Sequence, residues 1–254
     1  SRNIGKEKTG VAMAIITGDT SGISSSNKEA YRNTGISHVM AVSGMHVGFV
    51  QWAVTKMLSR RYVHYSARSA ISVLVLVMYA AIADFSPSVT RAMLQSGYLL
   101  TAKALKKPAS GQNALFFACI VQLMNNPYLL FNSGFVLSYG AAASMLYLLP
   151  ILSCKVFAFG TLPRWLASGL SVNIGLFPLL VTYFNSFSFI GIIATLFASK
   201  IAGAICVSGL GIWLLGYLPL GAIFMKLSAA ITSVAVIGLN FISETGSGIP
   251  LPFG

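Results

Sequence analysis

Apolar residues gather in long blocks between Val39 and Ile242, each about 18 to 25 residues, with short polar loops between them. A helix of about 20 residues crosses the roughly 30 Å hydrocarbon core of a bilayer, because each residue adds about 1.5 Å along the axis. Charged residues make up only 9% of the chain, whereas a soluble domain carries about 25%. We therefore expect an integral membrane protein.

The blocks predict an all-α, polytopic membrane helix bundle of about seven or eight transmembrane spans with broken or re-entrant helices. The predicted spans cover residues 39–58, 69–85, 89–105, 112–125, 128–152, 163–184, 188–217 and 220–242. The fourth span is short, and Lys200 and several glycines interrupt the long seventh span, so either can be a tilted, broken or re-entrant helix. Residues 1–37 alternate short apolar and polar runs, which predicts a separate extramembrane or interfacial helical segment. The polar start also suggests a piece of a longer protein.

Basic residues are concentrated in alternate loops. The chain has 17 Lys and Arg against five Asp and Glu, a formal net charge of +12. If the loops alternate between two sides, one side receives Lys56, Arg60, Arg61, Arg68, Lys103, Lys106, Lys107, Lys155 and Arg164. The positive-inside rule makes this side cytoplasmic and places residues 1–37 outside the cell. The near absence of acids favours an anionic partner, either phospholipid head groups or a polyanion that passes through, although topology alone is a competing explanation.

The densest group of polar residues is GISHVMAVSGMHVG at residues 35–48, where His38, Ser43, Gly44 and His46 stand at the entry of the first span. Ser43 and His46 are three residues apart and can meet on one helix face. A serine nucleophile with a histidine base, oriented by Asp19, is therefore conceivable. We favour the alternative that these groups bond to nearby backbone or line a pore.

Other chemistry has little support in the sequence. No GxSxG or HExxH pattern is present, and the three His and five carboxylates form no cluster with metal-ligand spacing. Cys119, Cys154 and Cys206 are far apart and lie in or beside apolar stretches, as expected of small packing residues. We therefore predict no catalytic residue, no metal site and no cofactor.

Two charged residues fall within predicted spans, Arg91 and Lys200, and Lys226 lies near the end of another. Each costs roughly 2.5 to 3.5 kcal/mol at the centre of a bilayer, so each should face protein or a wet cavity. For Arg91, an ion pair with the nearby Asp84 is the structural alternative to a functional role. Lys226 can snorkel to the interface.

Small residues four apart predict where helices approach closely, since lipid tails give no hydrophobic drive for helix association. The pairs with this spacing are Gly140 with Ser144, Gly134 with Ser138, and Ser199 with Gly203.

Four stretches resemble the signatures of the ComEC competence family, the polytopic inner-membrane proteins of bacterial DNA uptake. They are GD at residues 18–19 with AYRNTGISHVMAVSGMHVG at 30–48, RAMLQSGYLL from Arg91, NNPYLLFNSGFVLSYGAAAS at 125–144, and SVNIGLFPLLVTYF at 171–184. They occur in the family's order and cover nearly the whole chain. The family's motif positions match Gly18, Asp19, His38, Ser43, Gly44, His46, Arg91, Pro127, Gly134, Phe135, Ser138, Asn173 and Pro178.

The resemblance implies that residues 38–254 form the transmembrane competence domain, a channel for one strand of transforming DNA across the bacterial cytoplasmic membrane. It implies no enzymatic activity here, because the family's nuclease-like domain is a separate C-terminal unit that does not fit in 254 residues. The expected partners are single-stranded DNA, the phospholipid membrane, a DNA receptor and a cytoplasmic helicase or translocase. The channel forms either within one chain or at a homodimer interface, and both arrangements stay open.

A strand of phosphates needs a wet, positively biased path. The candidates for this path are Asp19, His38, Ser43, Gly44, His46, Arg91, Asn173 and Lys200, and the candidates for a basic cytoplasmic mouth are Arg60, Arg61, Lys106 and Lys107. A secondary transporter or permease for small anions is the alternative function, since it would use the same buried cations.

Overall fold

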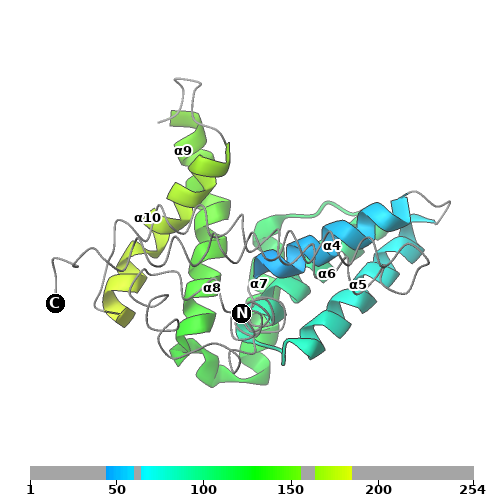
Figure 1. Ribbon diagram of the computed structural model, residues 1–254, viewed down its shortest axis with the longest axis horizontal. Helices are drawn as coiled ribbons and strands as arrows, with labels where there is room; N and C mark the ends of the chain where they lie inside the picture. The colour runs from blue at the N-terminus through cyan, green and yellow to red at the C-terminus, as the bar shows by residue number, and fades with distance from the viewer. Residues whose placement is uncertain (1–43, 60–63, 156–163, 185–254) are drawn as a thin grey trace, which may run out of the picture. The chain divides into compact units, whose positions relative to one another are not determined.

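The computed structural model describes residues 44–59, 64–155 and 164–184, and within these ranges every regular element is a helix. The chain divides into two compact units, one of residues 51–187 and one of residues 1–50 with 188–254, of which only 44–50 are described. The elements, labelled in Figure 1, are α4 (Gly44–Ser59), α5 (Tyr65–Ile82), α6 (Pro87–Ala104), α7 (Gly111–Asn125), η1 (Pro127–Phe131), α8 (Ser133–Ala143), η2 (Ser144–Leu148), α9 (Leu149–Lys155) and α10 (Arg164–Phe184).

The helices fall where the first six spans are predicted, so the all-α prediction is confirmed for the described residues. Among the described residues, three stretches are both long and apolar enough to cross a membrane: Tyr65–Ile82, Ser133–Leu152 and Leu166–Tyr183. The predicted spans at 188–217 and 220–242, and the segment 1–37, lie outside the described residues, so the full span count stays a prediction.

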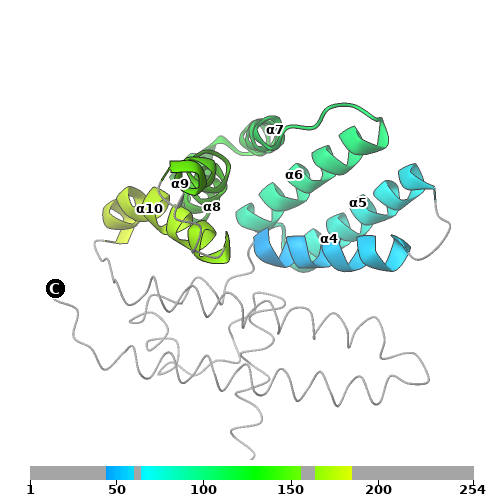
Figure 2. The same cartoon turned by 90° about the horizontal axis from the view of Figure 1, so that it is seen from above.

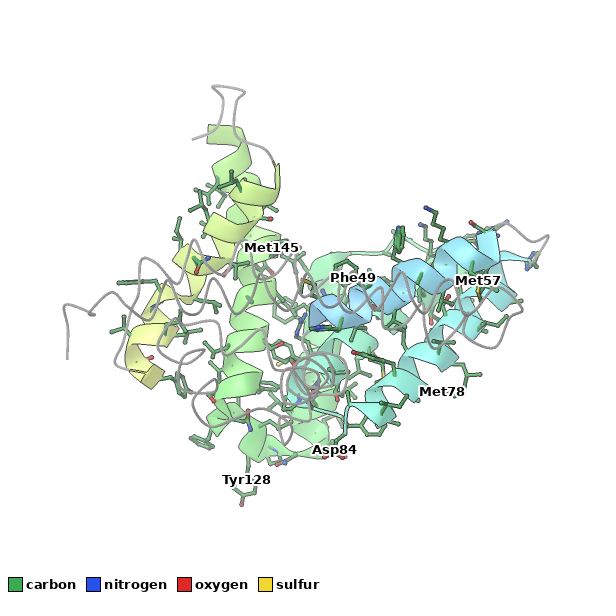
Figure 3. The ribbon with its side chains drawn as sticks, viewed as in Figure 1. Phe49, Met57, Met78, Asp84, Tyr128 and Met145 are labelled. Atoms are coloured by element: carbon green, nitrogen blue, oxygen red, sulfur yellow. The ribbon has the colours of Figure 1, made fainter. Side chains whose placement is uncertain are left out.

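Helix α5 exposes large apolar side chains and buries two small polar ones. Ser69 and Ser72 are 5% and 1% exposed and are buried together with Leu76, while Leu74 and Met78 are 61% and 53% exposed. Figure 3 shows Met78 on the outer side of the helix. A soluble helix does the opposite, because water drives its large apolar side chains inward. The pattern indicates a surface that faces lipid.

Two helices end in Schellman motifs, in which a residue with positive φ turns the chain back and two amides bond to the last carbonyls. After α5, Asp84 has φ 51°, and Phe85 N donates to Ala80 O over 2.8 Å. After α6, Lys106 has φ 53°, and Lys107 N donates to Ala102 O over 2.9 Å. The first motif makes a tight turn from α5 into α6, so these helices pack side by side (Figure 2).

Helices α8, η2 and α9 follow one another without a break and form one rod (Figure 1). Its η2 segment is a π-helix of five residues, a form that widens the helix by one residue. Helix α7 is a single helix of 15 residues, so the predicted fourth span is not broken. The predicted seventh span lies outside the described residues, and the described irregular geometry lies in the fifth span.

Helix α10 crosses the rod at its smallest side chains. A Cβ on Gly140 would lie 2.8 Å from Leu179 Cδ1, and one on Gly175 would overlap Ser144 Oγ. Ser171 is fully buried and donates to Ser144 O over 2.9 Å. The predicted contact at Gly140 and Ser144 is therefore confirmed.

The pair of Gly134 and Ser138 does not make a contact of this kind. Gly134 is exposed, and a Cβ there would meet only the side chain of Asn132, in its own turn. Ser138 instead bonds to a side chain of α6. The pair with Gly203 lies outside the described residues.

Candidate functional site

Arg91 bridges helices α6 and α8. Its Nε donates to Ser138 Oγ on α8 over 2.8 Å, and its Nη1 donates to Gln95 Oε1, one turn further along α6, over 2.8 Å. Residues four apart lie on the same helix face, so Gln95 can hold the guanidinium from its own helix. The two bonds fix both the position and the plane of a charged group that is half-buried in an apolar domain.

The local sequence positions Ser138 firmly. Asn132 caps the start of α8, because its Oδ1 accepts a hydrogen bond from Phe135 N over 3.2 Å. Phe135 is 3% exposed, and its ring centre lies 4.4 Å from that of Tyr139. Ser138 therefore sits in the second turn of α8, just after a capped first turn and among packed side chains. Arg91 and Ser138, two of the residues matched in the sequence resemblance, thus meet in space.

The hydrogen-bond partners of the Arg91 guanidinium are neutral groups. Asp84 is the one carboxylate within the ranges that the structure describes, and it lies exposed in the turn after α5. The hydrogen bonds of Arg91 go to a hydroxyl and an amide instead, so the structure gives no support to the predicted ion-pair alternative. A half-buried cation whose hydrogen-bond partners in the described ranges are neutral attracts anions, because the surrounding dielectric is low.

Helix α6 carries polar contacts from its start. Gln122 of α7 is 4% exposed, and its Nε2 donates to Pro87 O over 3.3 Å. Towards the other end of α6, the rings of Tyr98 and Phe117 pack with centres 5.5 Å apart. The contacts with α7 therefore flank the Arg91 cluster on both sides along the helix.

The basic residues lie at one end of α6. Lys103, Lys106 and Lys107 are all exposed there, and the Schellman motif sets the direction of the last two. The bond from Gln122 to Pro87 places the end of α7 beside the start of α6, so Asp84 and Tyr128 both lie at the opposite end (Figure 3). The predicted segregation of charge is present along α6 and α7.

The remaining predicted site residues are less closely connected. Gly44 begins α4, and His46 in the first turn of that helix is 1% exposed. Asn173 Nδ2 donates to Gly169 O over 2.9 Å and so bonds to its own helix. Among the described residues of the unit 51–187, no hydrogen bond joins Asn173 to Arg91, and Gly44 and His46 belong to the other unit. The predicted residues outside the described ranges are Asp19, His38, Ser43, Arg60, Arg61 and Lys200.

Sequence reasoning missed Gln95, Gln122 and Tyr139 as members of this region. The spacing of Gln95 from Arg91, four residues on a predicted helix, was a usable signal. The positions of Gln122 and Tyr139 in this region depend on how α7 and α8 pack against α6. No local sequence pattern predicts that packing. Among the described residues, no group of three or more His, Cys, Asp or Glu could hold a metal ion.

Comparisons with known proteins cover most of the chain. A family model described as "Competence protein" matches residues 15–253. ComE operon protein 3 of Bacillus subtilis is 30% identical over 188 residues, which are 73% of this chain and 24% of that protein. Recombination protein 2 of Haemophilus influenzae is 25% identical over 210 residues, which are 76% of this chain and 26% of that protein. The chain thus spans about a quarter of the length of these relatives. No solved structure matches it.

Proposed function

Because this chain belongs to the ComEC competence family, we propose that it forms the channel core through which single-stranded transforming DNA crosses the bacterial cytoplasmic membrane. The relatives' names point to competence and recombination, and the chain carries the apolar, outward-facing helices of a membrane domain. In this proposal residues 38–254 are the membrane domain, and the chain acts as a conduit without chemistry of its own.

The observation that carries the proposal is the charge of Arg91. A phosphodiester brings one negative charge per nucleotide into the bilayer, where a charge costs about 2.5 to 3.5 kcal/mol on insertion scales. Arg91 is a fixed cation within the bundle, and its held geometry comes from neutral partners. Such a group lowers the barrier for each phosphate in turn, and a single contact is weak enough to release it.

The basic end of α6 supports a path for the DNA strand that leads towards the cytoplasm. Lys106 and Lys107 are exposed beside Lys103, and we propose that they line the cytoplasmic mouth together with Arg60 and Arg61. By the positive-inside rule this end is cytoplasmic, which makes the segment 1–37 extracytoplasmic and the protein multi-pass.

In this proposal, partner proteins supply the DNA and the driving force. The sequence has no GxxxxGK[ST] phosphate-binding loop. We propose a DNA receptor on the outside and a helicase or translocase in the cytoplasm, with the channel built within one chain or between two copies.

Direct transport assays separate this function from a permease for small anions, which would also use Arg91. In a transformable bacterium that depends on this protein, we expect labelled DNA to reach the cytoplasm as nuclease-protected single strands. In proteoliposomes holding the protein, flux of chloride or phosphate should match that of protein-free liposomes. Normal DNA entry in a deletion strain, together with rapid anion flux in proteoliposomes, would instead assign the chain to anion transport.

A further inference from the structure

The Arg91 cluster has hydrogen-bond donors without acceptors. A guanidinium has five N–H groups, and the bonds to Ser138 and Gln95 use two of them, which leaves one on Nη1 and two on Nη2. The hydroxyl of Tyr139, next to Ser138 on α8, is enclosed and has no hydrogen-bond partner in the described part of the chain. Tyr139 directly follows Ser138, to which Arg91 Nε donates, so Arg91 and Tyr139 belong to the same contact between α6 and α8.

An enclosed donor without an acceptor costs about 1 to 3 kcal/mol, and native proteins satisfy most such groups with protein, water or an ion. Gln122 Oε1 is an acceptor that also lacks a partner, but the open positions on Arg91 and Tyr139 are donors, three of them on the guanidinium cation. The acceptors already present, Ser138 Oγ and Gln95 Oε1, are engaged by Arg91. The missing partner therefore carries several acceptor oxygens and a negative charge.

We propose that Arg91 and Tyr139 form a binding subsite for one phosphodiester group, with Ser138 and Gln95 as positioning residues that orient the guanidinium. This inference rests on the proposed function and names the chemical group that the site takes. A phosphodiester has two non-bridging oxygens and one charge, which suits a planar guanidinium fork together with one hydroxyl donor. Both side chains are half-buried as a whole, while the hydroxyl of Tyr139 is itself enclosed.

The hydroxyl of Tyr139 limits which groups fit. A tyrosine hydroxyl that donates to a phosphodiester oxygen gives a charge-assisted hydrogen bond, which is roughly twice as strong as a neutral one. An uncharged linkage keeps the shape of the phosphodiester, but its hydrogen bond to Tyr139 has only the strength of a neutral one. The subsite should therefore distinguish a phosphodiester from an uncharged methylphosphonate linkage.

Two sources carry this group in a membrane, the backbone of a DNA strand and the head group of a phospholipid. The test uses the protein in nanodiscs, with a fluorescent oligothymidylate for the first source. Phosphatidylglycerol that stays bound on extraction, counted by native mass spectrometry, reports the second. Tyr139→Phe removes only the hydroxyl and keeps the ring that packs on Phe135. Tyr147→Phe is the matched control, because Tyr147 belongs to the same rod and is 44% exposed.

We expect Tyr139→Phe to weaken oligothymidylate binding at least about fivefold, and Tyr147→Phe to leave it unchanged. A methylphosphonate oligomer should bind weakly and equally to all three proteins. Arg91→Gln should reduce the slope of log affinity against log salt by about 0.7, the contribution of one phosphate contact on a single strand.

The other outcomes are equally informative. If Tyr139→Phe loses phosphatidylglycerol and binds oligothymidylate normally, the subsite holds a lipid head group, and the proposed DNA path loses this site. If both ligands bind the variant as they bind the natural protein, the subsite does not exist, whereas the proposed function stands. If the natural protein binds no oligothymidylate at all, the proposed function fails.

Discussion

Replacing Gly175 by alanine is expected to destabilise the membrane domain by about 1 to 3 kcal/mol, the usual cost of overpacking a tight contact. A Cβ at this position would overlap Ser144 Oγ and lie 2.7 Å from Ser144 Cβ, at the crossing of α10 with the π-helical segment η2. The two helices must separate to accept it, which also breaks the bond from Ser171 to Ser144 O. Thermal unfolding of purified protein, followed by size-exclusion chromatography, measures the loss.

Two further variants make this test specific. Gly97→Ala is the control, since a Cβ there has no neighbour within 4 Å, and the substitution should stabilise α6 slightly. Ser144→Gly removes the atoms that the new methyl group meets, so it should recover much of the stability of Gly175→Ala in the double variant. Equal stability of the Gly97 and Gly175 variants would contradict the crossing described here.

Arg91→Gln is expected to lower transformation about a hundredfold, because each phosphate would then cross the bundle without its fixed counter-charge. A charge costs roughly 2.5 to 3.5 kcal/mol at the centre of a bilayer. Because each 1.4 kcal/mol changes a rate about tenfold, losing the counter-charge should slow transport by about a hundredfold. Glutamine keeps a polar side chain of moderate length, so the protein should still insert. Counting transformants per cell, with the protein quantified in membrane fractions, measures the effect.

Arg91→Lys separates charge from geometry. Lysine keeps the charge, but a single ammonium lacks the planar fork with which Arg91 bonds to Ser138 and Gln95 together. We expect an intermediate loss of about tenfold. Lys56→Gln is the charge-matched control, because Lys56 is exposed and lies 4.9 Å from the ring centre of Trp52, away from the cluster. Wild-type transformation by a well-expressed Arg91→Gln protein would remove Arg91 from the mechanism.

The sequence predicted the features that depend on local composition. Long apolar blocks placed α5, α6 and α10, and the spacing of Gly140 and Ser144 located a close helix contact. Basic loops also indicated the charged end of α6. These predictions succeed because membrane thickness and close backbone approach limit which residues a helix can use.

Features that depend on tertiary packing could not be predicted from the sequence. The residues of the π-helical turn at 144–148 show no pattern that distinguishes them from an ordinary α-helix. Lys106 adopts a positive φ, a conformation that glycine usually occupies. Asn173 is among the predicted path residues, yet its amide bonds to its own helix. The partners of Arg91 were also unpredictable, because Ser138 is 47 residues away in sequence.

The most direct measurement of the central claim, that the strand passes Arg91, is photocrosslinking during uptake. Transforming DNA that contains 4-thiothymidine is supplied to competent cells, irradiated while it enters, and the adducts are mapped by mass spectrometry. We predict adducts on peptides of α6 and α8 around Gln95 and Tyr139, and none around Leu74, which is 61% exposed on the outer face of α5. Adducts that avoid α6 and α8 while DNA still enters the cytoplasm would contradict the account.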